Sequence, residues 1–257
     1  MNEPHNAKKR FGQNFLHDPY VIERILRAIN PQPQETIVEI GPGLGALTVP
    51  LLERVQTLDV VELDRDVIPH LLQACGQAPG LRITQADALS IDYARFAPPG
   101  GKLRLIGNLP YNISTPLLFH LLAQAAVVAD MHFMLQKEVV ERMCADAGEN
   151  AYGRLSVALA ARCRVDHLFN VGAGAFRPAP QVESAIVRIV PRAPDFEIAD
   201  WARFDAIVTA AFSQRRKTLS NALKPLMDAD RIRAAGIDPT LRAERLHARD
   251  FAKLAAA

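Results

Sequence analysis

Short apolar runs rich in Val, Ile and Leu alternate with longer amphipathic stretches from Thr36 to about Val190. The short runs are typical of buried strands, and apolar residues three or four positions apart are typical of helices. Strands are expected at 36–40, 58–63, 81–84, 103–107, 131–135, 165–171 and 185–190. Helices are expected between them at about 46–55, 66–75, 116–126, 137–146 and 154–164. This alternation predicts an α/β fold with a seven-stranded, mostly parallel sheet covered by helices on both faces.

The alternation of strands and helices stops near residue 190. Pro191 begins the segment PRAPDF, which is typical of a linker, and no strand-like run follows it. The remaining residues indicate helices. The sequence therefore predicts one domain over residues 1–191, with an N-terminal flap and helix over residues 1–30, and a small α-helical domain over residues 192–257.

The composition allows a full hydrophobic core, since 49% of the 257 residues are hydrophobic. The apolar stretches are shorter than a membrane span, and the N-terminal residues MNEPHNAKKRFG lack the apolar core of a signal peptide. We therefore expect a cytoplasmic protein without a membrane partner. Three widely spaced cysteines and seven scattered histidines indicate neither a disulfide framework nor a metal site, and nothing in the sequence indicates more than a monomer.

Positive charge is concentrated at the C-terminal end of the chain. Residues 201–257 carry eleven Lys and Arg against six Asp and Glu, whereas residues 1–200 carry nineteen against twenty-two. The densest basic run of the predicted helical domain is Arg215-Arg216-Lys217. A basic appendage on a mildly acidic body favours attraction to phosphate, so this run is the candidate contact with a nucleic-acid backbone.

A glycine-rich turn, GPGLG from Gly41, joins the first predicted strand to its helix. Glycines there permit a tight turn and let a ligand approach main-chain amides. Glu62 ends the second strand, where a carboxylate can accept hydrogen bonds from both hydroxyls of a ribose. A nicotinamide dinucleotide fits this pattern nearly as well as other nucleotide-like cofactors do, because Gly41, Gly43 and Ala46 also satisfy the dinucleotide fingerprint.

Two further acidic residues can bind other parts of a nucleotide-like cofactor. Asp87 follows the third strand, where its carboxylate can accept the exocyclic amine of an adenine lying across the edge of the sheet. Glu39 stands just before the glycines and can hold a cationic amino-acid moiety, a group that nicotinamide dinucleotides lack.

The fourth strand ends in the tetrapeptide Asn108-Leu109-Pro110-Tyr111. An adenine amine is a poor nucleophile because its lone pair is delocalised into the ring, so an enzyme that modifies it must orient it. The Asn108 amide oxygen and the Leu109 carbonyl can accept its two hydrogens, while the Tyr111 ring stacks on the base. Taken alone, the tetrapeptide also fits a strand that ends in an ordinary turn.

These motifs closely resemble those of the small-subunit (16S) ribosomal RNA adenine-N6,N6 dimethyltransferases, which are relatives of the erythromycin-resistance rRNA methylases. The resemblance spans nearly the whole chain. Its segments are KRFGQNFLHDP from Lys9, VEIGPGLGALT from Val38, VELD from Val61, QADAL from Gln85, IGNLPYNIST from Ile106, QKEVVERM from Gln136, FRPAPQVESA from Phe176 and FSQRRKTLSNAL from Phe212.

The resemblance implies a Rossmann-like class I methyltransferase sheet and S-adenosylmethionine as cofactor. It also implies a 16S rRNA substrate, in an immature small ribosomal subunit, with methylation of two adjacent adenosines in the hairpin loop near the 3′ end. By the same resemblance the cofactor contacts are Asn14, Leu16, Gly41, Glu62, Asp87 and Asn108. Phe176 is implied to stack on the target adenine opposite Tyr111.

Three other classes of protein share some of these features. A nicotinamide-dependent dehydrogenase leaves the tetrapeptide and the basic tail without a role. DNA and protein amide methyltransferases usually carry Pro at the position of Leu109 and lack the helical tail. A non-catalytic RNA-binding or assembly factor can keep the fold after catalytic activity is lost. The candidate catalytic and cofactor residues Asn108, Tyr111, Glu62 and Asp87 are intact, which argues against that interpretation.

Overall fold

The computed structural model describes residues 13–214 and 216–257 and divides the chain into two compact units. The first unit comprises the residues up to Val140 together with Asp166–Pro191, and the second comprises Glu141–Val165 and Arg192–Ala257. These units differ from the predicted domains 1–191 and 192–257 in that residues 141–165 cluster with the second unit. They do so because Tyr152, Val157 and Ala161 are buried in one hydrophobic cluster with Phe204 and Phe251.

A seven-stranded sheet in the order β4-β3-β2-β5-β6-β9-β7 forms the centre of the fold. Its strands are β2 (Ile37–Ile40), β3 (Leu58–Glu62), β4 (Leu81–Gln85), β5 (Leu103–Asn108), β6 (Val128–Gln136), β7 (Cys163–Val171) and β9 (Ser184–Pro191). β2 pairs in parallel with both β3 and β5, β3 with β4, and β5 with β6, whereas β9 is antiparallel to β6. The α/β fold with a mostly parallel sheet is thus confirmed, and all seven predicted strands are present.

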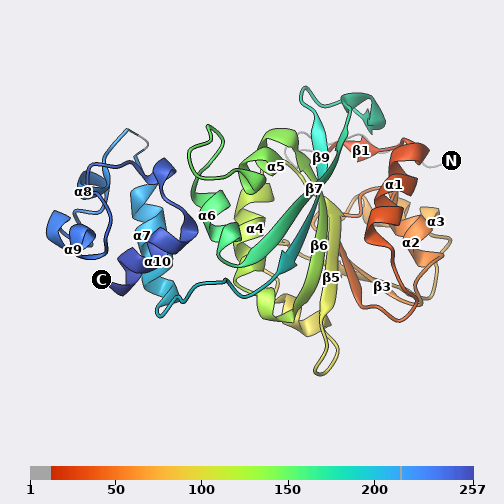
Figure 1. Ribbon diagram of the computed structural model, residues 1–257. Helices are drawn as coiled ribbons and strands as arrows, with labels where there is room; N and C mark the ends of the chain where they lie inside the picture. The colour runs from red at the N-terminus through yellow and green to blue at the C-terminus, as the bar shows by residue number, and fades with distance from the viewer. Residues whose placement is uncertain (1–12, 215) are drawn as a thin grey trace. The chain divides into compact units, whose positions relative to one another are not determined.

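Helices cover both faces of this sheet, and Figure 1 shows α1, α2 and α3 on one side and α4 and α5 on the other. Their bounds are α1 (Pro19–Ile29), α2 (Thr48–Leu52), α3 (Ile68–Ala74), α4 (Ser114–Leu122) and α5 (Lys137–Cys144), with short 3-10 helices η2 (Tyr93–Phe96), η3 (Ala125–Val127) and η4 (Ala173–Ala175). Asp18 begins α1 because its Oδ1 accepts the N–H groups of Tyr20 and Val21, at 2.9 and 3.2 Å. Asn30 ends the helix in the left-handed conformation, with φ of 46°.

A separate two-stranded sheet joins the N-terminal segment to a distant part of the first unit. β1 (Phe15–Leu16) pairs antiparallel with β8 (Phe176–Arg177), so that Leu16 lies opposite Phe176. The His17 N–H also donates to the Ala175 carbonyl, at 2.9 Å. The N-terminal flap is thereby fixed to the chain that leads into β9.

The second unit is helical. It contains α6 (Arg154–Ala160), α7 (Trp201–Ala211), α8 (Leu219–Ala222), α9 (Ala229–Ala234) and α10 (Ala248–Ala256), with the 3-10 helix η5 (Ala243–Arg245). Arg162 lies over the Trp201 ring, 4.3 Å from its centroid, and donates to both carboxylate oxygens of Asp205, at 2.8 and 2.7 Å. Among the described residues, no helix is both long enough and apolar enough to cross a membrane.

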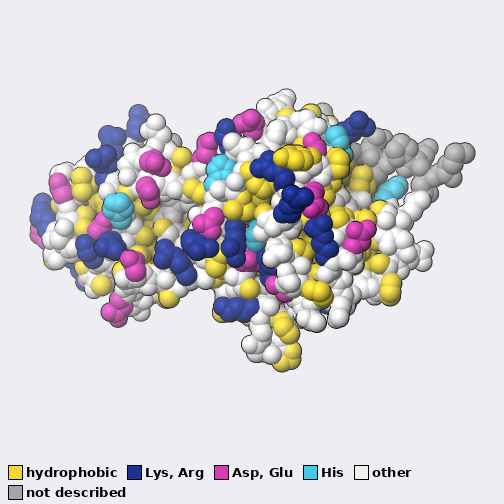
Figure 2. Space-filling model, turned by 45° about the vertical axis from the view of Figure 1, so that its right-hand side comes forward, with side chains coloured by type: hydrophobic (Ala, Val, Ile, Leu, Met, Phe, Trp, Pro, Cys, Tyr) yellow, Lys and Arg dark blue, Asp and Glu magenta, His cyan; other side chains and the backbone are white. Residues whose placement is uncertain are grey.

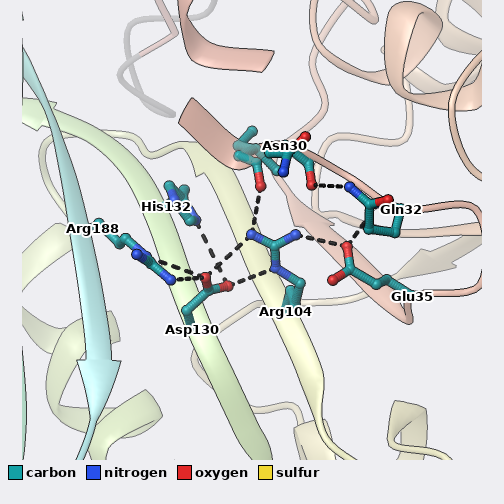
Figure 3. A network of polar contacts seen from close by, with 8 residues as sticks. Asn30, Gln32, Glu35, Arg104, Asp130, His132 and Arg188 are labelled. Carbon is teal, nitrogen blue, oxygen red and sulfur yellow. Dashed lines mark hydrogen bonds and ion pairs between the residues drawn. The ribbon is translucent and has the colours of Figure 1, made fainter. Parts of the chain in front are cut away.

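A buried ionic network connects β5, β6 and β9 (Figure 3). Arg104 donates to Asp130 at 2.8 Å, to Glu35 at 2.7 Å and to the Ile29 carbonyl at 2.6 Å. Arg188 donates to the same Asp130 carboxylate, at 3.1 Å. Because Arg104 and Asp130 also face each other across the strand register, the network ties the end of α1 to the centre of the sheet. It lies toward the start of β5, away from the carboxyl ends of the parallel strands.

Candidate active site

A cavity of about 310 Å³ opens where the parallel strands β2, β3, β4 and β5 end. The order of the sheet reverses between β2 and β5, and in open α/β sheets ligands bind at such a point. The cavity is lined by Gln13, Asn14, Phe15, Leu16, Glu39, Ile40, Gly41, Pro42, Gly43, Leu44, Ala46, Leu47, Val61, Glu62, Leu63, Ala86, Asp87, Ala88, Asn108, Leu109, Pro110, Tyr111, Asn112 and Ile113. Those described lining residues include three carboxylates and no Lys or Arg, so the cavity suits a cationic ligand better than a pyrophosphate.

The glycine turn forms one wall of the cavity. Gly41 and Gly43 have φ values of 68° and 55°, a conformation that residues with a side chain rarely adopt. The Gly41 N–H donates to the Val61 carbonyl at 2.9 Å, which fixes the turn to β3. A Cβ atom on Gly43 would lie 3.2 Å from two ring carbons of Phe15. Glycine at position 43 therefore lets the N-terminal flap approach the turn closely.

Glu62 ends β3 and is 7% exposed at the cavity wall. One of its carboxylate oxygens accepts the Asp64 N–H at 2.8 Å, and the other accepts the Gly43 N–H at 3.4 Å. Burial raises the pKa of the carboxyl group above its usual value. The main-chain bonds orient the carboxylate, so it can accept hydroxyl donors from a ligand in the cavity.

Glu39 is the most deeply buried carboxylate of the cavity wall. It is 1% exposed, and its Oε2 accepts the Thr48 hydroxyl at 2.7 Å. Burial raises the pKa of Glu39 to about 7. A buried carboxyl with no cation beside it favours its neutral form, so an arriving cation would stabilise the ionised form.

Asp87 lies beyond the end of β4 and is exposed at the rim of the cavity. Its Oδ1 accepts the Leu89 N–H at 2.9 Å, and its carbonyl accepts the Ser90 hydroxyl at 2.9 Å. These local bonds set the orientation of the carboxylate. A carboxylate at this position can accept an exocyclic amine.

Asn108 and Leu109 present acceptors at the end of β5. The Asn108 Nδ2 donates to the Asn14 carbonyl at 3.0 Å, which leaves the amide oxygen as the acceptor of that side chain. The Leu109 side chain is 1% exposed, and its N–H donates to the Met134 carbonyl at 3.1 Å. The polar group that Leu109 retains for a ligand is its carbonyl.

Tyr111 is half-buried and adds an aromatic wall to the same cavity. Its hydroxyl lies 2.7 Å from the Ser184 hydroxyl, and its carbonyl accepts the Ser114 hydroxyl at 3.0 Å. Burial raises the pKa of the phenol, so the ring stays neutral at physiological pH. A neutral ring held at its hydroxyl, on a residue whose main chain is also hydrogen-bonded, is suited to stacking on a flat base.

Eight residues predicted from the sequence therefore line one cavity: Asn14, Leu16, Gly41, Glu62, Asp87, Asn108, Leu109 and Tyr111. Phe176, which the resemblance assigns to the target adenine, does not line it. It is 2% exposed and lies in a hydrophobic cluster with Leu16, Ile106 and Met134. The β1–β8 pairing holds it in that cluster, so of the two aromatic residues only Tyr111 faces the cavity in the described part of the chain.

The basic run lies in the second unit, after α7. Arg215 falls outside the described residues, while Arg216 and Lys217 are exposed in a turn. Figure 2 shows Lys and Arg side chains distributed over the visible face of this unit, with acidic side chains between them. Exposure makes Arg216 and Lys217 available to a polyanion.

Sequence reasoning missed Gln13 and Ser184. The Gln13 Nε2 donates to Asp64 Oδ2 at 3.1 Å, which gives the N-terminal segment a second polar attachment, to the loop that follows β3. Gln13 stands beside Asn14 in the same segment, but no pattern relates it to a carboxylate 51 positions away. Ser184 is part of the FRPAPQVESA segment, and nothing in that segment indicates its bond to Tyr111.

Comparisons with known proteins agree with this geometry. A model of the family described as ribosomal RNA adenine dimethylase matches residues 4–257. A relative from Pseudomonas aeruginosa named ribosomal RNA small subunit methyltransferase A is 55% identical over 252 residues, which cover 98% of this chain and 94% of the relative. A relative of the same name from Hahella chejuensis is 52% identical over 255 residues, with 99% and 93% covered.

Two solved structures are similar over nearly the whole fold. A dimethyladenosine transferase from Plasmodium falciparum has a TM-score of 0.78 and 26% identity, with 93% of this chain and 95% of that chain covered. The 23S rRNA methyltransferase ErmE has a TM-score of 0.72 and 24% identity, with 95% and 98% covered, and this likeness concerns the fold.

Proposed function

The chain belongs to the ribosomal RNA adenine dimethylase family, and from this premise we propose how its cavity carries out the methylation of adenine in RNA. It is an S-adenosylmethionine-dependent rRNA adenine dimethyltransferase. The single observation that supports the proposed mechanism is the placement of Asn108, Leu109 and Tyr111 on the same cavity as Glu39, Glu62 and Asp87. The first three residues can orient an amine, and the three carboxylates can hold a nucleoside with a cationic side chain.

The cavity residues fit the cofactor by their chemistry. Glu62 accepts the ribose hydroxyls, and Asp87 accepts the exocyclic amine of the cofactor's adenine. Glu39 holds the cationic amino-acid end. Asn14 and Leu16, in the segment that β8 holds in place, line the cavity and would shield the sulfonium centre from water. The cofactor supplies an electrophilic methyl group when it is bound.

The clamp residues act on the target base by positioning. The Asn108 amide oxygen and the Leu109 carbonyl accept the two amine hydrogens, which directs the nitrogen lone pair toward the methyl donor, and Tyr111 stacks on the ring. No side chain is required as a general base, because the amine nitrogen becomes acidic once it is alkylated and loses its proton to water. After the first transfer one N–H remains to be held, so the second transfer requires that the clamp accept a methyl group in place of one hydrogen bond.

For the substrate, we propose two adjacent adenosines in the hairpin loop near the 3′ end of 16S rRNA, within an immature small ribosomal subunit. Adenines in a loop cost less to present to a cavity than paired ones do. The exposed basic residues of the helical unit, with Arg215, contact the phosphates, and the proposed enzyme acts in the cytoplasm as a monomer. Phe176 contributes by holding the flap strand through its pairing with Leu16.

The test is transfer of a labelled methyl group from S-adenosylmethionine to three substrates: bare 16S rRNA, small subunits from cells that lack this modification, and 23S rRNA. Mass spectrometry of the nucleosides should detect N6,N6-dimethyladenosine from one of the first two substrates. The label should map to adjacent adenosines of the 3′ hairpin loop. Label in 23S rRNA alone would reject the proposed substrate, and the absence of label in every substrate would reject the activity.

A further inference from the structure

Ser184 lies outside the cavity wall, yet its hydroxyl is the contact at the far end of the Tyr111 ring. Ser184 is fully buried, and the two hydroxyl oxygens are 2.7 Å apart. Tyr111 is thus attached at both ends, since Ser114 donates to its carbonyl at 3.0 Å. A residue that touches the stacking side chain without touching the ligand is placed to control the orientation of that side chain.

The position of Ser184 is itself fixed by neighbouring main-chain bonds. It is the first residue of β9 and pairs with Gln136 at the end of β6. The preceding residue, Glu183, accepts the Lys137 N–H at 2.9 Å and the Lys137 ammonium group at 2.8 Å. The buried serine hydroxyl therefore projects from a fixed main-chain position and is not a surface group.

The geometry of a phenol defines what this attachment controls. The hydroxyl oxygen lies on the axis about which the ring rotates, so a bond to it fixes the direction of the ring axis. Transfer between reacting groups is sensitive to misplacement of about 1 Å, so a ring that tilts would misplace a base stacked on it.

We infer that Ser184 is a positioning residue for methyl transfer, which acts by holding the Tyr111 ring in the orientation that receives the target adenine. This inference rests on the proposed function of Tyr111 as the stacking residue. It assigns to Ser184 no contact with either ligand.

Steady-state kinetics of Ser184→Ala, Tyr111→Phe and the double variant test the inference. Ser184→Ala should lower kcat about tenfold, because loss of a buried hydrogen-bond partner has effects of this order. The KM for S-adenosylmethionine should stay unchanged. Tyr111→Phe should lower kcat similarly, and the double variant should be no worse than either single one. Effects that multiply would overturn the inference, because Ser184 would then act by another route.

A spectroscopic measurement tests the same contact without relying on activity. The chain has four tyrosines, so 3-fluorotyrosine labelling gives four ¹⁹F signals, and the one missing from Tyr111→Phe belongs to Tyr111. Ser184→Ala should shift this signal and leave the other three in place. An unmoved signal overturns the inference even if methylation fails for another reason. A moved signal without rRNA methylation by the wild-type protein would instead count against the proposed function.

Ser156→Ala is the matched control, because Ser156 is another buried serine with a hydrogen-bonded hydroxyl and belongs to the helical unit. It should lower the free energy of unfolding without changing kcat or the Tyr111 signal. If both serine variants lower kcat equally at equal loss of stability, Ser184 is only structural and the inference is wrong.

Discussion

The Asn108 side-chain amide donates a 3.0 Å hydrogen bond to the main-chain carbonyl of Asn14. This bond joins the end of β5 to the N-terminal flap, two segments 94 positions apart. The bond directs one N–H of the amide toward Asn14, and the amide oxygen remains an acceptor for a target amine. The N-terminal segment proposed to cover the cofactor and the tetrapeptide proposed to receive the base are therefore connected through one side chain.

Replacement of Asn108 by Ala should remove turnover while RNA affinity changes little. The variant loses the acceptor that orients the amine, and it also loses the donor to Asn14, so S-adenosylmethionine should bind more weakly as well. We expect kcat to fall by about 100-fold or more, the scale of loss when a positioning group is removed. Single-turnover methylation and filter binding of RNA measure the two quantities separately.

Asn170→Ala provides the control for that experiment, because Asn170 is an exposed asparagine that does not line the cavity. It should behave as the wild type. Near-normal turnover of Asn108→Ala would show that the clamp assignment is wrong.

Binding of S-adenosylmethionine should depend on pH through Glu39. The pKa of this buried carboxyl is raised to about 7, so at lower pH the ligand-free protein holds it protonated. If the cofactor's ammonium group binds beside it, the carboxyl must ionise and release a proton. Affinity should then rise with pH below 7, by up to about tenfold per pH unit.

Isothermal titration calorimetry at pH 6 in two buffers with different ionisation enthalpies measures the released proton. Glu39→Gln removes the titrating group at nearly constant volume, so the buffer dependence should disappear and the affinity should fall. A proton release that persists in Glu39→Gln would assign it to another group and contradict the proposed role.

Much of the fold is predictable from the sequence because its strands are short β-branched runs bounded by polar turns. The seven strands of the main sheet carry that local signal, and the cavity residues Glu39, Glu62, Asp87 and Asn108 follow from their positions at the ends of these strands. β1 and β8 carry no such signal, since each has two residues and their pairing joins positions about 160 apart. Periodicity cannot indicate a contact of this kind.

The contacts that the sequence does not indicate are those between side chains far apart along the chain. Ser184 and Tyr111 are 73 positions apart, and neither residue type requires the other. For Phe176 the motif identifies a candidate site residue but does not indicate where its side chain lies. Its ring is buried in the core instead of lining the cavity, because the chain around it pairs with β1.

The stability of the first unit should fall in mild acid because of His132. This histidine is 3% exposed and lies 3.8 Å from Asp130, with Arg104 and Arg188 on the same carboxylate (Figure 3). Burial lowers the pKa of His132 from 6.5 to about 4. Between these values the unfolded chain binds a proton that the folded protein excludes. The contribution of His132 to the free energy of unfolding is therefore fully present above pH 6.5. It is lost as the pH falls toward 4, by about 1.4 kcal/mol per pH unit.

Urea unfolding of the wild type and His132→Leu at pH 7.5 and 5 measures this contribution. The wild type should lose about 2 kcal/mol more than the variant between the two values. Glu39 has the opposite effect on stability, because its raised pKa favours the folded state as the pH falls. The difference in the loss of unfolding free energy between the wild type and His132→Leu therefore isolates the contribution of His132. Equal losses in both proteins would contradict the assignment to His132.

The basic run of the helical unit should account for part of the salt dependence of RNA binding. Each phosphate neutralised by a Lys or Arg releases counterions, and each such contact contributes about 0.7–0.9 to the slope of log affinity against log salt. Replacing Arg215, Arg216 and Lys217 together by Ala should therefore reduce the slope by about two units and weaken binding at low salt. The kcat at saturating RNA should change little, since the described residues of this run lie outside the cavity wall.

Arg233→Ala serves as the control, because its guanidinium is already paired with Asp230 at 2.6 Å and should contribute less to the salt dependence. If the triple variant keeps the wild-type slope, the phosphates are contacted elsewhere, and the concentration of positive charge at this end of the chain has another role.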